Sequence, residues 1–176
     1  MQAGGVILYP TDTIWGLGCD ATNPEAVKRI YEIKKRVDSK ALILLVDKDV
    51  KIQFYVDEVP EIAWTLLEVA DKPLTVIYDG ARNLAPNVIA EDGSVGIRIT
   101  KEPFSHKLCE RFRKAIVSTS ANISGELSPR TFAEISQEIK DSVDYIVGYR
   151  QEDTKQAAPS GIIKIGKSGT VKVIRE

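Results

Sequence analysis

Three short polar segments carry residue types that can hold a small polar or anionic ligand. The first, residues 10–18 (PTDTIWGLG), places two hydroxyls and a carboxylate between an apolar run and two glycines. Such groups bind small polar substrates, and glycine lets the backbone approach a ligand closely. Taken alone, the composition is more typical of a hydroxyl-rich turn in which Asp12 bonds its own backbone.

The second segment is a cluster of cations. Lys34, Lys35, Arg36 and Lys40 fall within seven positions, between a predicted helix end and a predicted strand start. Such a cluster can bind phosphate groups. Cations at a helix C-terminus also interact favourably with the helix dipole, by a few tenths to about 1 kcal/mol, so the cluster alone leaves both readings open.

The third segment, residues 118–125 (STSANISG), combines four hydroxyls, one amide and a terminal glycine directly after an apolar run. These small groups can donate hydrogen bonds to phosphate or ribose oxygens. An extended serine-rich turn would have the same composition, and the segment alone does not separate the two interpretations.

The elements that must position these segments follow from the apolar patterning. Asn23-Pro24 predicts a capped helix that ends near Lys34, and Thr131 predicts another helix capped by its own hydroxyl. Further helices are expected at residues 62–69 and 104–112, and strands at residues 6–9, 41–46, 74–78, 95–99, 115–118, 145–147, 161–165 and 171–174. Interleaved helices and strands predict an α/β fold, with a twisted mixed sheet flanked by helices in a single domain over residues 1–176.

Bulk properties exclude several classes of protein. Apolar residues make up 43% and charged residues 28%, the balance of a folded globular chain, and no stretch has the roughly 20 apolar residues of a membrane helix. The N-terminal residues do not read as a signal peptide, so a cytoplasmic location is expected. A net charge of −1 gives no global attraction to nucleic acid, so any polyanion site must be local.

Cysteine and histidine offer little for metal binding or nucleophilic catalysis. Cys19 and Cys109 lie far apart and are interpreted as buried residues rather than a disulfide or metal ligands. His106 is the only histidine, which argues against most histidine-based triads, and we expect it on a helix surface. No metal site built from protein side chains is predicted.

In their order along nearly the whole chain, these segments resemble the threonylcarbamoyl-AMP synthase family, the YrdC-like domain. The resemblance is carried by Thr11 to Thr13, Lys34, Arg36, Lys40, Arg98, Ser120, Asn122, Pro159-Ser160 and Arg175. The chain departs from the family pattern at Trp15, Val37, Ala41 and Gly161. These departures bear on substrate preference more than on nucleotide binding. Family members carry a helix before the first strand, whereas five residues precede Val6 here, so a shortened N-terminus is expected.

The resemblance implies a YrdC/RibB-like fold and an L-threonylcarbamoyladenylate synthase. Such an enzyme forms threonylcarbamoyl-AMP and pyrophosphate from L-threonine, bicarbonate and ATP, with Mg²⁺ as the expected companion of ATP. The product serves the threonylcarbamoyl-adenosine modification of tRNA, so handover to tRNA-modifying proteins and weak tRNA contact are expected.

The resemblance also implies a role for each matching residue. Lys34 and Arg36 would be catalytic and, with Lys40, would hold the triphosphate. The nucleotide would be bound by Arg36, Lys40, Ser120, Asn122, Ser128 and Arg175, and the threonine by Thr13, Arg98 and Ser160.

Two alternatives keep the fold and change the activity. One is an RNA-binding YrdC-like module without adenylate-forming activity, which would use the cations of residues 34–40; the absence of interleaved aromatic residues argues against it. The other is a carbamoyl-adenylate module of the kind found in hydrogenase maturation proteins, which are longer multidomain chains.

Overall fold

The computed structural model of the protein describes residues 1–36 and 42–176. Its strands are β1 (Ile7–Tyr9), β2 (Gly16–Gly18), β3 (Ile43–Val46), β4 (Leu74–Tyr78), β5 (Val95–Ile99), β6 (Ile116–Ser120), β7 (Tyr145–Ile146), β8 (Gly161–Ile165) and β9 (Val171–Arg175). Its α-helices are α1 (Pro24–Ile33), α2 (Ile52–Tyr55), α3 (Glu61–Val69), α4 (Pro103–Phe112) and α5 (Gln137–Ser142). Short 3₁₀ turns are η1 (Asp49–Lys51), η2 (Pro86–Val88) and η3 (Phe132–Glu134).

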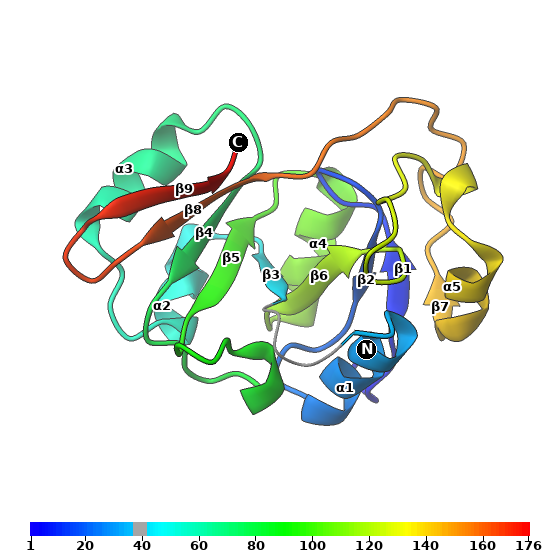
Figure 1. Cartoon of the computed structure of the whole chain (residues 1–176), viewed down its shortest axis with the longest axis horizontal. Coiled ribbons are helices and arrows are strands. Elements are labelled where there is room, and N and C mark those ends of the chain that lie inside the picture. Colours follow the sequence, from blue (N-terminus) through cyan, green and yellow to red (C-terminus); the bar gives the residue numbers. More distant parts are fainter. Residues whose placement is uncertain (37–41) are drawn as a thin grey trace.

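The described strands form one nine-stranded sheet in the order β7-β1-β2-β6-β3-β5-β4-β8-β9 (Figure 1). The pairs β1–β7, β3–β5 and β4–β8 are parallel, whereas the other neighbours run antiparallel. The sheet is therefore mixed, which confirms the predicted α/β class.

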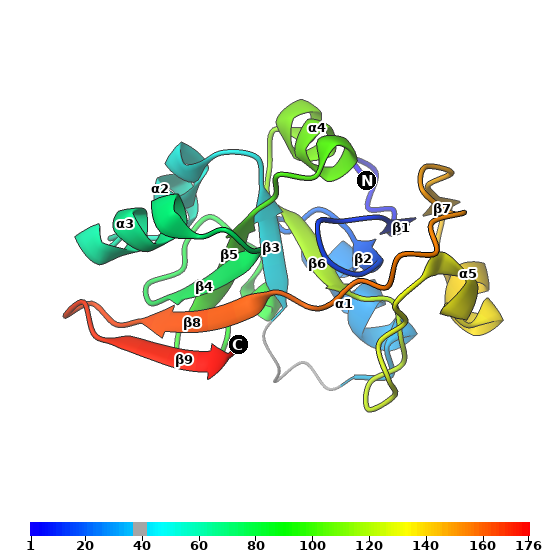
Figure 2. The same ribbon diagram turned by 90° about the horizontal axis from the view of Figure 1, so that it is seen from above.

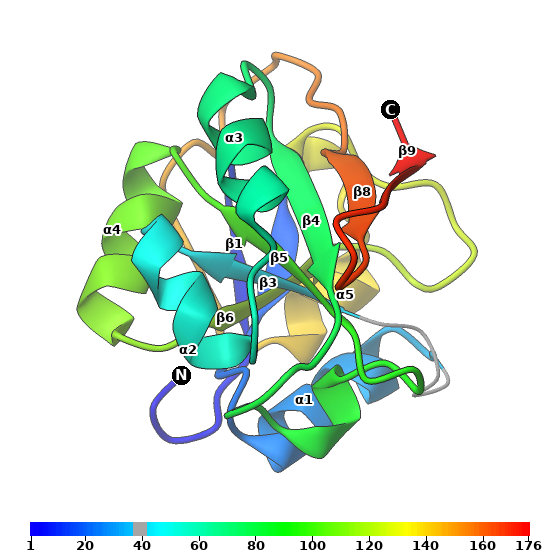
Figure 3. The same cartoon turned by 90° about the vertical axis from the view of Figure 1, so that its left-hand side faces the viewer.

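Helices cover both faces of the sheet because successive strand residues point to opposite sides. Ile7 and Tyr9 of β1 pack in one apolar cluster with Cys109 of α4, whereas Leu8 packs in a second cluster with Ile30 of α1. Figures 2 and 3 show α2, α3 and α4 together on one side and α1 on the other. None of the described helices has the length and apolar character needed to cross a membrane.

Helix α1 begins and ends as its sequence predicts. The side chain of Asn23 accepts hydrogen bonds from the backbone N–H groups of Glu25 and Ala26, and Pro24 occupies the first turn. The helix ends at Ile33 with Lys34 as its C-cap residue, and Lys35 takes a left-handed conformation with φ of 50°. This turn ends the helix directly before Arg36, so the cation cluster begins at a fixed helix terminus.

Two predictions about local structure are wrong, and one helix was not predicted. Thr131 makes no capping hydrogen bond and precedes only η3; α5 begins later because the hydroxyl of Ser136 accepts from the N–H of Ile139. Residues 16–18 form strand β2, although two glycines made them read as a loop. The short helix α2 was not predicted.

Candidate active site

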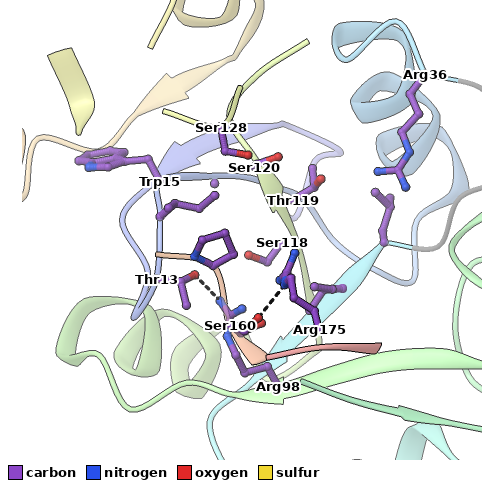
Figure 4. Close-up of a pocket in the computed structure, with 15 residues that line it drawn as sticks. Thr13, Trp15, Arg36, Arg98, Ser118, Thr119, Ser120, Ser128, Ser160 and Arg175 are labelled. Carbon is purple, nitrogen blue, oxygen red and sulfur yellow. Dashed lines mark hydrogen bonds between the residues drawn. The ribbon is translucent and has the colours of Figure 1, made fainter. Parts of the chain in front are cut away.

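A cavity of about 240 Å³ lies where segments distant in the sequence converge (Figure 4). Its walls come from the β1–β2 loop, the segment after α1, the start of β3, strand β5, the end of β6 and the loop after it, the segment before β8, and the end of β9. The described residues that line it are Thr13, Ile14, Trp15, Gly16, Arg36, Leu42, Ile43, Arg98, Ser118, Thr119, Ser120, Ser128, Pro159, Ser160 and Arg175.

Strand register brings these segments to one place. Gly16 of β2 lies opposite Ser120 of β6, and Ser118 of β6 lies opposite Ile43 of β3. In β5, Arg98 lies between Leu45 of β3 and Thr75 of β4. The predicted polar segments therefore meet because their strands pair, and not because they are close in sequence.

Arg98 and Thr13 are buried residues of the wall. The guanidinium Nη2 of Arg98 donates to Thr13 Oγ1 at 3.2 Å and forms an ion pair with Asp12 Oδ1 at 3.0 Å. Burial raises the pKa of Asp12, and the neighbouring Arg98 charge counteracts this. Thr11 Oγ1 lies 3.0 Å from Thr13 Oγ1 and donates to the carbonyl of Ile14 at 2.8 Å. This side of the cavity is thus cross-linked before any ligand binds.

Ser160 and Arg175 meet at the adjoining wall. Arg175 Nε donates to the carbonyl oxygen of Ser160 at 2.9 Å, and the Ser160 hydroxyl lies 2.8 Å from that of Thr75. Figure 4 shows both side chains beside Arg98. Arg175, near the C-terminal end of the sequence, is therefore part of the pocket wall.

The charge of the lining suits an anion. Three of the described lining residues are arginines, and none of the described lining residues is an aspartate or glutamate. Burial lowers the pKa of Arg36, and burial together with the charge of Arg98 lowers the pKa of Arg175. A guanidinium in such a setting gains from a negatively charged ligand more than a solvated one does.

Lys34 and Asn122 are not among the residues that line the cavity. Lys34 is buried, and its ammonium donates to the carbonyl oxygens of Ser120 at 2.6 Å and Asn122 at 2.7 Å. Burial, with a smaller contribution from Arg36, lowers the pKa of Lys34 to about 8. The amide of Asn122 donates to the carbonyls of Ile123 and Glu126. In this structure both side chains bind the loop after β6, and their contact with a substrate stays a prediction.

The other sequence predictions divide into three groups. Thr13, Arg36, Arg98, Ser120, Ser128, Ser160 and Arg175 meet at the cavity as expected, and their roles stay predictions. Lys40, Val37 and Ala41 lie outside the described residues. Cys19 and Cys109 are free thiols and buried, as interpreted, and no group of His, Cys, Asp or Glu in the described part of the chain is arranged to hold a metal ion.

Sequence reasoning missed two features of the site. Asp12 pairs with Arg98 instead of only closing its own turn, a contact that depends on where the fold places the β1–β2 loop relative to β5. Trp15 forms part of the wall and packs against Phe132 with ring centroids 4.8 Å apart. Its aromatic character was visible in the sequence, but its partner was not.

Known proteins are similar to this chain over its whole length. A sequence model of the Sua5/YciO/YrdC family, described as "Telomere recombination", matches residues 1–176. The threonylcarbamoyl-AMP synthase of Vibrio parahaemolyticus is 32% identical, with 100% of this chain and 94% of the relative covered.

Two solved structures are similar over most of this chain. E. coli YciO superposes with a TM-score of 0.85 at 25% identity, covering 99% of this chain and 84% of the other. P. abyssi Sua5 complexed with L-threonine superposes with a TM-score of 0.82 at 26% identity, covering 93% of this chain and 48% of the other. The full-length family match, the fold and the shared motifs lead to one conclusion: the chain belongs to the Sua5/YciO/YrdC family.

Proposed function

We propose that this protein is an L-threonylcarbamoyladenylate synthase, a nucleotidyltransferase that uses L-threonine, bicarbonate and ATP. The observation that carries the proposal is a cavity lined by Arg36, Arg98 and Arg175 together with hydroxyl groups, without a carboxylate among its described lining residues. The relative from Vibrio parahaemolyticus carries the name threonylcarbamoyl-AMP synthase.

The chemistry requires positioning and charge neutralisation. The amine of threonine attacks the carbon of bicarbonate, water leaves, and a carbamate forms. A carbamate oxygen then attacks the α-phosphate of ATP. The bond from the α-phosphorus to the bridging oxygen breaks, and pyrophosphate leaves with the electron pair. No side chain must act as a covalent nucleophile, so fixed cations aimed at the leaving pyrophosphate lower the barrier most.

Within this proposal Arg36 binds the triphosphate, with Lys40 as its predicted companion. Arg175 closes the nucleotide side, where Ser120 and Ser128 offer hydroxyl groups to the nucleotide. Both arginines have lowered pKa values because they are partly buried, and an anionic ligand would relieve that cost.

The threonine side consists of Thr13, Arg98 and Ser160. A guanidinium can bind both oxygens of a carboxylate with two parallel hydrogen bonds, which suits Arg98 for the threonine carboxylate. The P. abyssi Sua5 structure is a complex with L-threonine, and this supports a threonine site in a related fold.

Lys34 and Asn122 act on the nucleotide side through the loop after β6. Because the Lys34 ammonium holds the carbonyls of Ser120 and Asn122, it fixes the loop that presents the Ser120 hydroxyl. We therefore assign Lys34 a positioning role in the reaction and leave direct catalysis to Arg36.

The proposal includes the companions of the reaction. The described lining residues offer hydroxyls but no carboxylates, so Mg²⁺ arriving with ATP would be held by phosphate oxygens and water. The labile product would pass to tRNA-modifying proteins, with at most weak tRNA contact, and the enzyme would act in the cytoplasm.

The decisive experiment measures pyrophosphate release and an AMP-containing product from ATP, bicarbonate and L-threonine. We expect both to require all three substrates, so omission of threonine or bicarbonate is the matched control. Pyrophosphate release that is independent of threonine would contradict the proposal.

The RNA-binding alternative makes a different prediction. Phosphate contacts weaken steeply with salt, so labelled tRNA titrated at two salt concentrations would show strong, salt-dependent binding if the cations of residues 34–40 bound RNA. Such binding without adenylate formation would favour the alternative. The name of the relative favours the enzyme.

A further inference from the structure

Arg150 contacts the β1–β2 loop from a segment far away in the sequence. Residues 147–160 lead from β7, near one end of the sheet, to β8, near the other, and pass along its upper edge in Figure 1. Arg150 Nη1 donates to the carbonyl oxygen of Thr11 at 3.2 Å, across 139 positions. Arg150 is not among the residues that line the cavity.

The guanidinium of Arg150 is itself held by two carboxylates. Its Nε donates to Asp153 Oδ2 at 2.7 Å, and its Nη1 lies 3.5 Å from Glu102 Oε1. Glu102 is buried, and its other oxygen accepts from the N–H of Ser105 at 2.7 Å, where it caps α4. The arginine is therefore tied both to its own turn and to the start of a helix.

The backbone at this point adopts a strained conformation that contacts on both sides support. Arg150 has a φ of 64°, a left-handed conformation that costs a non-glycine residue free energy. The preceding Tyr149 stacks on Phe104 of α4, with ring centroids 5.8 Å apart. Such strain persists where the surrounding structure fixes it, and here it directs the arginine towards Thr11.

Thr11 transmits this contact to the pocket. Its hydroxyl accepts from the N–H of Thr13 at 3.0 Å and lies 3.0 Å from the Thr13 hydroxyl, which in turn accepts from Arg98. Thr13 and Arg98 both line the cavity. The path from Arg150 to the cavity wall thus runs through one carbonyl and one pair of hydroxyls.

We propose that Arg150 is a positioning residue that holds the Thr11–Thr13 loop in the shape that binds the amino-acid substrate, without touching that substrate. This inference rests on the proposed function. It predicts that loss of Arg150 weakens threonine binding more than ATP binding, because the contact ends on the threonine side.

The test compares two identical substitutions at matched backbone positions. Arg150→Gly removes the guanidinium while glycine accepts the left-handed backbone. Arg113→Gly is the control, because Arg113 also has a φ of 64°, is exposed at the end of α4 and does not line the cavity. We expect the KM for threonine to rise about tenfold in Arg150→Gly, with the KM for ATP near that of wild type, and neither to change in Arg113→Gly.

A second readout reports the loop without requiring activity. The chain has two tryptophans, so a Trp64→Phe background leaves Trp15, which follows the loop and lines the cavity, as the reporter. In this background, acrylamide should quench the fluorescence of Trp15 more strongly when Arg150→Gly is added. Adding Arg113→Gly should leave the quenching unchanged.

The outcomes separate the inference from the proposed function. The positioning role would be overturned if Arg150→Gly and Arg113→Gly had the same KM for threonine and the same acrylamide quenching of Trp15 fluorescence. If the wild type makes no adenylate, the proposed function fails, whereas quenching still decides whether Arg150 holds the loop. If Arg150→Gly does not fold, Arg150→Lys is measured in its place. Lysine keeps one charged donor, so the KM for threonine should lie between those expected for the wild type and for Arg150→Gly. Wild-type values of both the KM and the quenching would overturn the inference.

Discussion

Arg98 and Arg36 line the same cavity but are held in different ways. Arg98 is buried in the middle of the sheet, where Asp12 and Thr13 fix its guanidinium. Arg36 follows the end of α1, is half-buried, and has a pKa lowered by that burial. On the surface of α1, by contrast, the hydrogen bond from Arg29 to Asp144 raises the pKa of Arg29.

The difference indicates a division of work within the cavity. Arg98 supplies shape, because its ion pair with Asp12 fixes its position before a ligand binds. An arginine destabilised by burial supplies charge, because an anion would relieve the cost of that burial. Under the proposed function, the threonine side would select the substrate and the triphosphate side would stabilise the leaving group.

The largest expected effect tests the charge-supplying side at Arg36. If Arg36 stabilises the leaving pyrophosphate, Arg36→Ala should cost about 2–4 kcal/mol of transition-state stabilisation, a 10²–10³-fold fall in rate. Arg36→Lys should recover part of the rate, since lysine keeps the charge but loses the two-pronged geometry. The measurement is pyrophosphate release beside a thermal melt of each variant.

Arg29→Ala is the matched control for this comparison. It removes an arginine from α1 itself, where the ion pair with Asp144 is exposed and contributes at most about 1 kcal/mol to stability. We expect near wild-type activity. An active Arg36→Ala protein would mean that the cations only interact with the helix dipole, which stabilises the fold by a few tenths to about 1 kcal/mol.

The next prediction tests the close packing of the strands behind the cavity, at Gly18 of β2. A Cβ there would lie 2.5 Å from the Tyr9 ring and 2.9 Å from the carbonyl of Val117, and the buried ring and the paired strand cannot easily move. Gly18→Ala should therefore destabilise the fold by about 1–3 kcal/mol. Gly148→Ala, where a Cβ meets nothing within 4 Å, should change stability by less than about 0.5 kcal/mol in the same denaturant titration. Equal midpoints for the two variants would show that β2 is not packed as described.

Substrate choice tests whether the fixed side selects. Threonine should be preferred over valine, because an unpaired buried hydroxyl partner costs roughly 1–3 kcal/mol, or about 5- to 150-fold in kcat/KM. Pyrophosphate release with each amino acid at matched ATP and bicarbonate measures the ratio. Equal turnover would mean that Thr13, Arg98 and Ser160 do not form the amino-acid pocket.

The last expected effect concerns the pH dependence of stability at Lys34. Its pKa is about 8 in the folded protein, below its ordinary value of 10.5, because burial disfavours the ammonium. The unfolded chain therefore binds more protons between these values, and stability should rise with pH across that window and not change below it. The rise, measured relative to Lys34→Met, should reach at most about 3 kcal/mol, since one pKa unit corresponds to about 1.4 kcal/mol.

Lys28→Met provides the comparison for this titration. Lys28 lies on α1 as well, but its side chain is 62% exposed. Denaturant unfolding between pH 7 and 10.5 should show the pH-dependent difference for Lys34→Met and none for Lys28→Met. A flat profile for both would mean that the Lys34 ammonium is not destabilised by burial.

Local patterns predicted most of the elements. Residues 74–78 and 95–99 have the bounds of β4 and β5, because both are rich in the β-branched residues that favour strands. Asn23 with Pro24 predicted the start of α1, because a cap depends only on its nearest neighbours. At Thr131 the competing Ser136 cap could not be ranked from sequence, so the helix was predicted to begin too early.

The fold class and the composition of the site were determined by the sequence itself. Hydroxyl-rich loops after apolar runs, a cation cluster at a helix end and a late arginine were all visible, because residue type and short spacing set local structure. Their assembly was decided by the tertiary structure. The pairing of Asp12 with Arg98, the burial of Lys34 among backbone carbonyls, and the reach of Arg150 to Thr11 join residues 85 or more positions apart. Such contacts depend on strand order and register, which spacing along the chain does not specify.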